Sequence, residues 1–418
     1  MIMVTQTFHN LVYRSLGAAI GLFTYSFISK NQSAEAFAEL VVIQAVSMLF
    51  VAFCHFGQPL ALLKMISGNG TNENQFKRNE IFTVSCLICL SIVFLASILV
   101  FTLNEYFAGL LNTKSENLYI LFLIILFKVL QILMQEFFRS INNFRIFNIM
   151  QVLPQTLFIV LLIANKSFYE NVFELINIYL TSIIFLVIFA SFALAANGFK
   201  PILSKNKLFH AYALMPLGYA FFLVTVFDVF SMEYSFIYLS SKVDPLTIAC
   251  YAISLKLLMF LSMGVKALNS VTKPQISNLY SNNKINELKK LSKNYILFGI
   301  SFYSISMFIF YMFGEMFIDY AFDFDPQLIT KLFLLLSITV FINAITGPIG
   351  SIMEMCDLHI VYRNISAAGA ILFLIFAILL INSIGIIGII IALLIYELFI
   401  NCSSWGYIIL KKKIFFTS

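Results

Sequence analysis

Long apolar segments of helical length fill nearly the whole chain, and short polar gaps separate them. A bilayer core needs about 20 consecutive apolar residues for each helical span. These segments are apolar all round, not alternately polar and apolar, so the pattern predicts membrane helices and not the strands of a barrel. Twelve spans are expected, at Leu11–Ile28, Phe37–Leu63, Ile81–Leu103, Leu118–Phe138, Phe144–Ala164, Val172–Ala196, Ala211–Leu239, Leu246–Val271, Tyr295–Phe317, Leu328–Ile352, Ile365–Ile381 and Ile384–Leu410.

The composition strengthens this interpretation. Of 418 residues, 61% are hydrophobic and only 11% are charged. A soluble domain could not cover so much apolar surface, and in lipid the backbone polar groups must be satisfied within each segment. The stretch 1–14 carries one basic residue, Arg14, and the first apolar segment lacks a small-residue cleavage site. We therefore expect that segment to be retained as the first helix.

Lys and Arg gather in every second gap. If the N-terminus is inside, eighteen of the 26 basic residues fall on the cytoplasmic side and five on the other side. The positive-inside rule then places both termini in the cytoplasm, and an even number of spans agrees with that. The net charge of +6 reflects this topology, so no nucleic-acid partner is expected. Three lysines, Lys128, Lys256 and Lys266, lie inside apolar segments.

Several features recur between the two halves of the chain. The longest polar stretches, Lys64–Glu80 and Thr272–Asn294, follow the second and eighth spans. Pro59 and Pro274 are expected to close those same spans. These matches predict two parallel six-helix lobes, related by an axis along the membrane normal. The predicted lobes are residues 1–203 and 204–418.

A second match lies at the turns after the fourth and tenth spans. Glu136 with Arg145 and Glu354 with Arg363 both have the form E-x8-R. Arginines are common in cytoplasmic turns, so this match gains weight only together with the prolines and the polar stretches.

Charges deep in apolar segments need an explanation, because a charge at the bilayer centre costs about 2.5–3.5 kcal/mol on insertion scales. Lys256 lies about 17 Å along its helix from Asp244, at 1.5 Å per residue, so its stem cannot reach water. Lys128 and Asp228 are similarly central. Glu233 lies higher in the seventh span.

Two interpretations of these charges stay open and are compatible. In one, they form structural ion pairs, with Asp228 and Lys256 as the obvious pair. In the other, they line a water-filled cavity between the lobes that holds a polar or anionic substrate. Arg14 and Lys266 lie near span ends and can reach the interface by snorkelling. The candidate cavity residues are Arg14, Lys128, Asp228, Glu233, Lys256 and Lys266.

Two further polar residues are weaker candidates. His55, close to Pro59, fits a buried, hydrogen-bonded histidine better than a functional one. Glu397 lies well inside the twelfth span. The first span also carries a stripe of mostly small residues, which usually means close helix packing but would also suit a helix that lines a cleft. That stripe is Asn10, Arg14, Gly17, Ala18, Gly21 and Tyr25.

Other chemistry finds little support in the sequence. Cys86 and Cys89 form a C-x-x-C inside an apolar segment, so they are interpreted as small buried hydrophobes, and no metal site is expected. There is no P-loop, zinc-protease motif, nucleophile elbow or Arg-rich voltage sensor.

Twelve spans, two parallel lobes, Pro59 and Pro274, and the polar stretches after those spans resemble the multidrug/oligosaccharidyl-lipid/polysaccharide (MOP) exporter superfamily. Within it, the chain is most similar to Wzx-type O-antigen flippases. The resemblance implies an all-α, MATE-like fold whose V-shaped cavity opens alternately to each side. It also implies an undecaprenyl-diphosphate-linked oligosaccharide substrate, moved across a bacterial inner membrane during lipopolysaccharide biosynthesis. By position, the resemblance carries a substrate role to Arg14, Lys128, Asp228, Lys256 and Lys266.

Three functions are therefore weighed. The first is the flippase, with a lipid-linked glycan and membrane lipid as partners, and with polysaccharide polymerase and chain-length proteins as further candidates. The second is a cation-coupled multidrug exporter, in which Asp228 or Glu233 would bind the coupling ion. The third is a polysaccharide polymerase or ligase, which needs a larger periplasmic loop than Asp319–Gln327 offers. A transporter needs no cofactor, and coupling to a proton or sodium gradient stays open.

Overall fold

The computed structural model describes residues 2–68, 75–102, 115–165, 172–202, 207–240 and 242–412. The chain folds as two compact units. One unit is Glu39–Val229, and the other is Met1–Ala38 together with Phe230–Ser418. Each is named after a helix that packs against several others, so we call the first the α6 unit and the second the α13 unit. The first helix thus packs with the second half of the chain, while most of the seventh predicted span packs with the first half. The two-fold repeat behind the predicted lobes 1–203 and 204–418 stays a prediction.

In the α6 unit, α6 contacts α3, α4, α7 and α8. Its side chains Ile124, Val129, Leu133 and Phe138 are fully buried by these neighbours. The helices of this unit are α2 (Ala34–Cys54), α3 (Gln58–Gly68), α4 (Gln75–Thr102), α6 (Ser115–Ser140), α7 (Phe144–Ala164), α8 (Val172–Ala196) and most of α9 (Lys207–Ser240).

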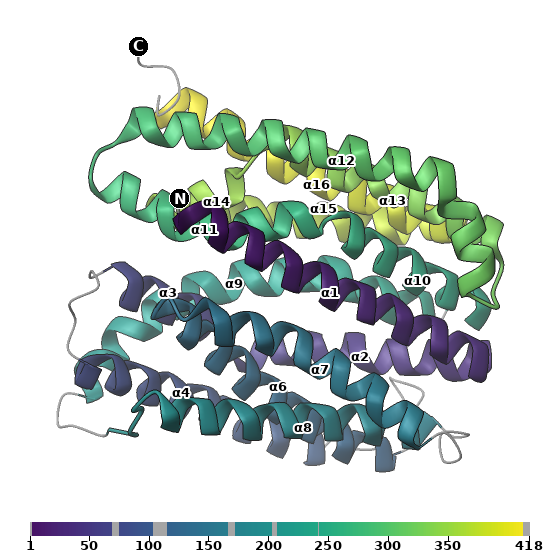
Figure 1. Ribbon diagram of the computed structural model, residues 1–418, viewed down its shortest axis with the longest axis horizontal. Helices are drawn as coiled ribbons and strands as arrows, with labels where there is room; N and C mark the ends of the chain where they lie inside the picture. The colour runs from purple at the N-terminus through teal and green to yellow at the C-terminus, as the bar shows by residue number, and fades with distance from the viewer. Residues whose placement is uncertain are drawn as a thin grey trace. The chain divides into compact units, whose positions relative to one another are not determined.

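In the α13 unit, α13 packs against α10, α12 and α16, and α1 packs on α10 and α11. The long helices α15 and α16 pack against each other (Figure 1). They form a hairpin that turns at Gly385, whose φ is +61°. The helices are α1 (Ile2–Asn31), α10 (Pro245–Leu261), α11 (Met263–Ser281), α12 (Ile285–Ala321), α13 (Pro326–Thr346), α14 (Ile349–Met355), α15 (His359–Ile384) and α16 (Ile386–Tyr407), followed by a π-helical turn, Ile408–Lys412.

The predicted helical, many-span class is confirmed. Among the residues that the structure describes, ten helices are long and apolar enough to cross a membrane, and α10 with the start of α11 forms an eleventh candidate that is bent by 53°. The described residues form no strand. The total of twelve spans and the cytoplasmic position of both termini stay predictions.

Three predicted spans are broken, so their prediction as continuous helices was wrong. The break in Phe37–Leu63 separates α2 from α3, where Phe56 and Gly57 have φ of 47° and 64°. The break in Leu328–Ile352 separates α13 from α14 at Gly347, with φ of 74°, and Pro348, which has no N–H to donate. The break in Leu246–Val271 lies at Ser262, between α10 and α11.

The two prolines also have different roles from those predicted. Pro59 is the second residue of α3 and Pro274 lies inside α11, so neither closes a helix. Most of the polar stretch Thr272–Asn294 is helical, because α11 continues to Ser281 and α12 starts at Ile285.

The break between α2 and α3 crosses α9 closely. A Cβ built on Gly57 would overlap the carbonyl oxygen of Gly218 and the backbone nitrogen of Phe222. A Cβ on Gly218 would lie 2.9 Å from the carbonyl oxygen of Phe56. The crossing therefore requires glycine on both sides, and at Gly57 the positive φ adds a second reason.

We predict that Gly57→Ala strongly destabilises the protein. Left-handed strain costs about 1–2 kcal/mol and overpacking about 1–3 kcal/mol more. Gly385→Ala has the strain alone, since nothing lies within 4 Å of its Cβ, and Gly406→Ala has neither cost. The unfolding temperature in detergent should therefore be lowest for Gly57→Ala and higher for Gly385→Ala. For Gly406→Ala it should be near that of the wild type. A Gly57 variant as stable as Gly385→Ala would show that the crossing is not tight.

Candidate functional site

Lys256 lies over the ring of Tyr25. Its ammonium is 4.6 Å from the ring centroid, with Lys256 on α10 and Tyr25 on α1. Tyr25 is only 6% exposed and Lys256 is half-buried. Glu233, near the end of α9, is close enough for its carboxyl to interact electrostatically with Lys256. The α13 unit thus brings together two predicted cavity residues, Lys256 and Glu233.

The ring of Tyr25 is held firmly in place. It meets Phe37 edge to face at 5.1 Å between centroids, and Phe37 meets Phe324 in the same way at 5.6 Å. The end of α1 is also tied to the end of α12, because Ser26 Oγ donates to the carbonyl of Ala321 at 2.5 Å. Lys256 therefore rests on a rigid aromatic surface.

The α6 unit contains a second lysine of the same kind. Lys128 on α6 lies over the ring of Tyr179 on α8, with 5.5 Å between its ammonium and the ring centroid. Tyr179 in turn packs edge to face on Phe158 of α7, at 5.5 Å. Both lysines that the sequence places too deep for water are thus on tyrosine faces.

A tyrosine face lowers the cost of such a lysine without neutralising it. A cation over an aromatic ring gains about 0.5–2 kcal/mol, against an insertion cost of about 2.5–3.5 kcal/mol. The ring carries no net charge, so it leaves the positive charge of the ammonium in place. Each unit therefore presents a cationic group beside an aromatic surface.

The structure places the other predicted cavity residues as follows. Asp228 is half-buried on α9 in the α6 unit, whereas Lys256 belongs to the α13 unit, so their ion pair stays a prediction. Lys266 is exposed on α11, which fits the predicted snorkelling. Arg14 lies in α1, and its side chain is outside the described residues.

His55 and Glu397 take part in structural contacts. His55 Nδ1 accepts from the backbone N–H of Gly57 at 3.1 Å, and the His55 carbonyl accepts from Cys89 Sγ at 3.4 Å. His55 therefore closes the break between α2 and α3. Glu397 accepts from Asn401 Nδ2 at 3.3 Å, within a network that joins α13 and α16.

That network was missed by the sequence analysis. Asn401 Nδ2 also donates to Asn343 Oδ1 at 3.1 Å, and Thr346 Oγ1 donates to Asn401 Oδ1 at 2.9 Å. The indole N–H of Trp405 donates to the carbonyl of Thr346 at 2.8 Å. Thr346 is the last residue of α13, so the network satisfies backbone at the Gly347 break.

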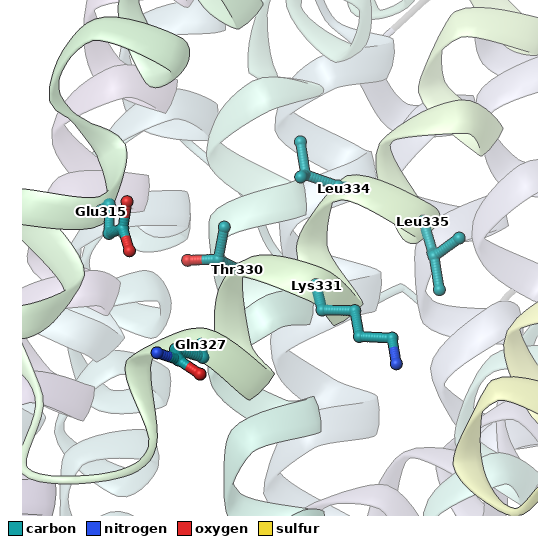
Figure 2. A pocket seen from close by; sticks show the side chains of 6 residues that line it. All are labelled: Glu315, Gln327, Thr330, Lys331, Leu334 and Leu335. Carbon is teal, nitrogen blue, oxygen red and sulfur yellow. The ribbon is translucent and has the colours of Figure 1, made fainter.

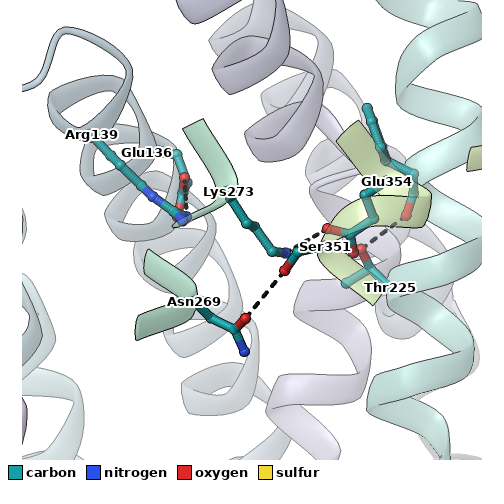
Figure 3. A network of polar contacts seen from close by, with 8 residues as sticks. Glu136, Arg139, Thr225, Asn269, Lys273, Ser351 and Glu354 are labelled. Atoms are coloured by element: carbon teal, nitrogen blue, oxygen red, sulfur yellow. Dashed lines mark hydrogen bonds and ion pairs between the residues drawn. The ribbon is translucent and has the colours of Figure 1, made fainter. Parts of the chain in front are cut away.

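Two glutamates from the E-x8-R matches form ion pairs with other residues. Glu354 Oε2 lies 2.5 Å from Lys273 Nζ, which joins α14 to α11, and Ser351 Oγ donates to Asn269 Oδ1 at 3.2 Å beside it (Figure 3). Glu136 pairs with Arg139 at 3.2 Å. The repeat therefore locates the two glutamates but not their partners.

No two of the six cysteines form a disulfide in the described structure. In the part of the chain that the structure describes, no three His, Cys, Asp or Glu side chains gather as metal ligands.

No protein-family model and no curated protein matches the chain. Solved structures do match it over nearly their whole length. They include the MATE multidrug transporter DinF-BH, solved in complex with a ligand, at 16% identity and a TM-score of 0.76 over 100% of this chain and 96% of that one. An aspartate-to-asparagine mutant of the Vibrio cholerae MATE transporter VcmN matches at 16% identity and a TM-score of 0.73, over 97% and 95%.

A third match has the same architecture. It is an outward-facing MATE family transporter of the MOP superfamily, at 12% identity and a TM-score of 0.71 over 99% of this chain and 95% of that one. At these identities the matches establish the fold, and the predicted MATE-like fold class is confirmed.

We predict a measurable coupling between Lys256 and Tyr25. Tyr25→Phe keeps the ring and should leave stability near wild type, whereas Tyr25→Leu removes it. A double-mutant cycle of Tyr25→Leu with Lys256→Met, read from unfolding in detergent, should give about 0.5–2 kcal/mol of coupling. Additive effects would mean that the ring contributes only its packing.

The partly buried pair Lys273–Glu354 should be more sensitive than an exposed one. Glu354→Gln leaves the Lys273 ammonium without its carboxylate and should cost about 1–3 kcal/mol of stability. Glu287→Gln, in the exposed pair with Lys284, should cost less than about 1 kcal/mol. Equal losses from both substitutions, measured by thermal unfolding, would contradict the structural role of the partly buried pair.

Proposed function

We propose that the chain is an alternating-access flippase for an undecaprenyl-diphosphate-linked oligosaccharide. The observation that carries this proposal is the pair of deep lysines on tyrosine faces, Lys128 on Tyr179 and Lys256 on Tyr25. The full-length match to MATE folds supports a transporter, since the matched proteins are named as transporters.

The chemistry of the lysines suits such a substrate. A glycan cannot enter hydrocarbon, whereas its polyprenyl tail can remain in lipid. A diphosphate needs cationic partners, and lysine serves phosphate as a compact point charge. The tyrosine rings hold these ammonium groups in place on their faces. In the α13 unit, Lys256 would therefore bind the diphosphate and Glu233 would contact glycan hydroxyls. Lys128 and Asp228 are the candidates for the same two roles in the α6 unit.

The broken helices also favour transport. Discontinuous membrane helices recur in transporters, where non-helical backbone lies in protein or lines a cavity. Here α2–α3, α10–α11 and α13–α14 are broken, in both units. On this proposal the protein works in the bacterial inner membrane, with polysaccharide polymerase and chain-length proteins as partners, and draws on a proton or sodium gradient.

A cation-coupled multidrug exporter is the second candidate. Two matched structures bear on it, because one is named as a multidrug transporter and another as a multidrug resistance transporter. In that case Glu233 or Asp228 on α9 would bind the coupling ion. The two deep lysines disfavour it, because they would repel a cationic drug.

Complementation of a deletion strain tests the proposal. Lys256→Ala and Lys128→Ala should reach the membrane at wild-type levels but lower surface polysaccharide by roughly 10- to 100-fold, since a charged hydrogen bond contributes about 1.5–3 kcal/mol. The exposed Lys290→Ala serves as the matched control and should be normal.

Drug susceptibility of the same strains separates the two candidates. The flippase proposal predicts unchanged susceptibility in the deletion strain. Normal surface polysaccharide together with raised drug susceptibility would overturn it in favour of the exporter, and Glu233→Gln should then abolish resistance.

A further inference from the structure

A pocket of about 460 Å³ lies between α12 and α13, outside the candidate site (Figure 2). Glu315 comes from α12, and the other lining residues come from the first three turns of α13. They are Gln327, Thr330, Lys331, Leu334 and Leu335. One acid, one base, two polar groups and an apolar floor thus share one cavity.

The two charged side chains of this pocket take no part in holding its helices together. Glu315 and Lys331 are both exposed, and in the described part of the structure neither makes an ion pair or a hydrogen bond. Thr330 Oγ1 is buried and has no hydrogen-bond partner there. In Figure 2, Glu315 and Thr330 face each other across the gap between the two helices, with Gln327 beside them. Glu315 and Lys331 are therefore open to a ligand, and the unsatisfied hydroxyl of Thr330 lies beside them.

The depth of these groups along their helices matches a lipid headgroup. At 1.5 Å per residue, Glu315 lies roughly 9 Å from the end of α12 at Ala321, and Lys331 roughly 7 Å from the start of α13 at Pro326. Leu334 and Leu335 lie roughly 12–14 Å from that start, at acyl-chain depth. Tyr320, next to the end of α12, is 80% exposed. An exposed tyrosine at a helix end is typical of a membrane interface.

We propose that this pocket binds a zwitterionic phospholipid with a primary-amine headgroup. Glu315 accepts hydrogen bonds from the lipid ammonium, with the oxygens of Gln327 and Thr330 as further acceptors. Lys331 binds the phosphate, and an acyl chain lies along Leu334 and Leu335. The site is separate from the proposed substrate residues and does not depend on the flippase function.

The charges select against other ligands. An anionic lipid would meet the carboxylate of Glu315, and a metal ion would make no use of Lys331 or the leucines. A choline headgroup is zwitterionic as well, but its trimethylated nitrogen has no N–H to donate to Glu315 or Thr330. The basic-residue bias places this end of α12 and α13 on the outer side, so the outer leaflet would supply the lipid.

Lipid titration of the purified full-length protein tests the proposal, with bound lipid counted by native mass spectrometry. Phosphatidylethanolamine, phosphatidylcholine and phosphatidylglycerol with identical acyl chains are compared. The expected result is one ethanolamine lipid per chain, preferred at least tenfold over the other two. Glu315→Gln should remove the preference over choline lipid, and Lys331→Gln should weaken binding of all three at least tenfold.

Matched controls lie near the same membrane face. Asp319→Asn and Lys242→Gln change exposed charges that line no part of the pocket and should bind as wild type does. Equal binding of all three lipids, or unchanged selectivity in Glu315→Gln, would overturn the proposal and leave only unspecific annular lipid. Soluble phosphoethanolamine could also displace the bound ethanolamine lipid as effectively as free lipid does. That result would assign the pocket to a soluble zwitterion and would also overturn the proposal.

Discussion

The insolubility of an ammonium group in hydrocarbon is the constraint on which the interior of this protein depends. The sequence places Lys128 and Lys256 at a depth where their stems are not expected to reach water, and each rests on a tyrosine face. Those faces are in turn fixed by edge-to-face contacts with Phe158 and Phe37. Because a tyrosine face lowers the cost of the charge without cancelling it, an ammonium held in this way keeps its electrostatic attraction for an anion.

Much of the architecture could be predicted from hydrophobic pattern alone. Spans such as Phe144–Ala164 and Val172–Ala196 coincide with α7 and α8, because a membrane helix must satisfy its own backbone and so follows its apolar length. The breaks at Gly57, Ser262 and Gly347 could not be predicted so easily. The apolar pattern continues through a break, so the sequence does not mark it. The break depends on residues far away in the sequence, such as Gly218 behind Gly57 and Trp405 beside Thr346.

The candidate site was predictable only in part, for a similar reason. The depth of a residue along its helix can be calculated from the rise per residue alone. That depth identifies Lys128 and Lys256 as lysines with a high free energy of insertion. Their partners require knowledge of which helices are neighbours. Lys273 and Glu354 are 81 positions apart, and nothing in the local sequence of either residue indicates the other. The E-x8-R matches indicated a repeat and named no partner for Glu354, and helix packing gives it a lysine on α11.

The polar side chains inside the two units therefore serve two different purposes. His55, Thr346, Asn401 and Trp405 satisfy backbone or one another where helices break, and hydrogen bonds of this kind hold a non-helical backbone in one conformation. The deep lysines instead hold a charge at a fixed place on an aromatic face. Hydrogen bonds at the breaks restrain the backbone there, and the aromatic contacts fix each lysine within its own unit. On the proposed function, the lysine faces and not the breaks would therefore meet the substrate.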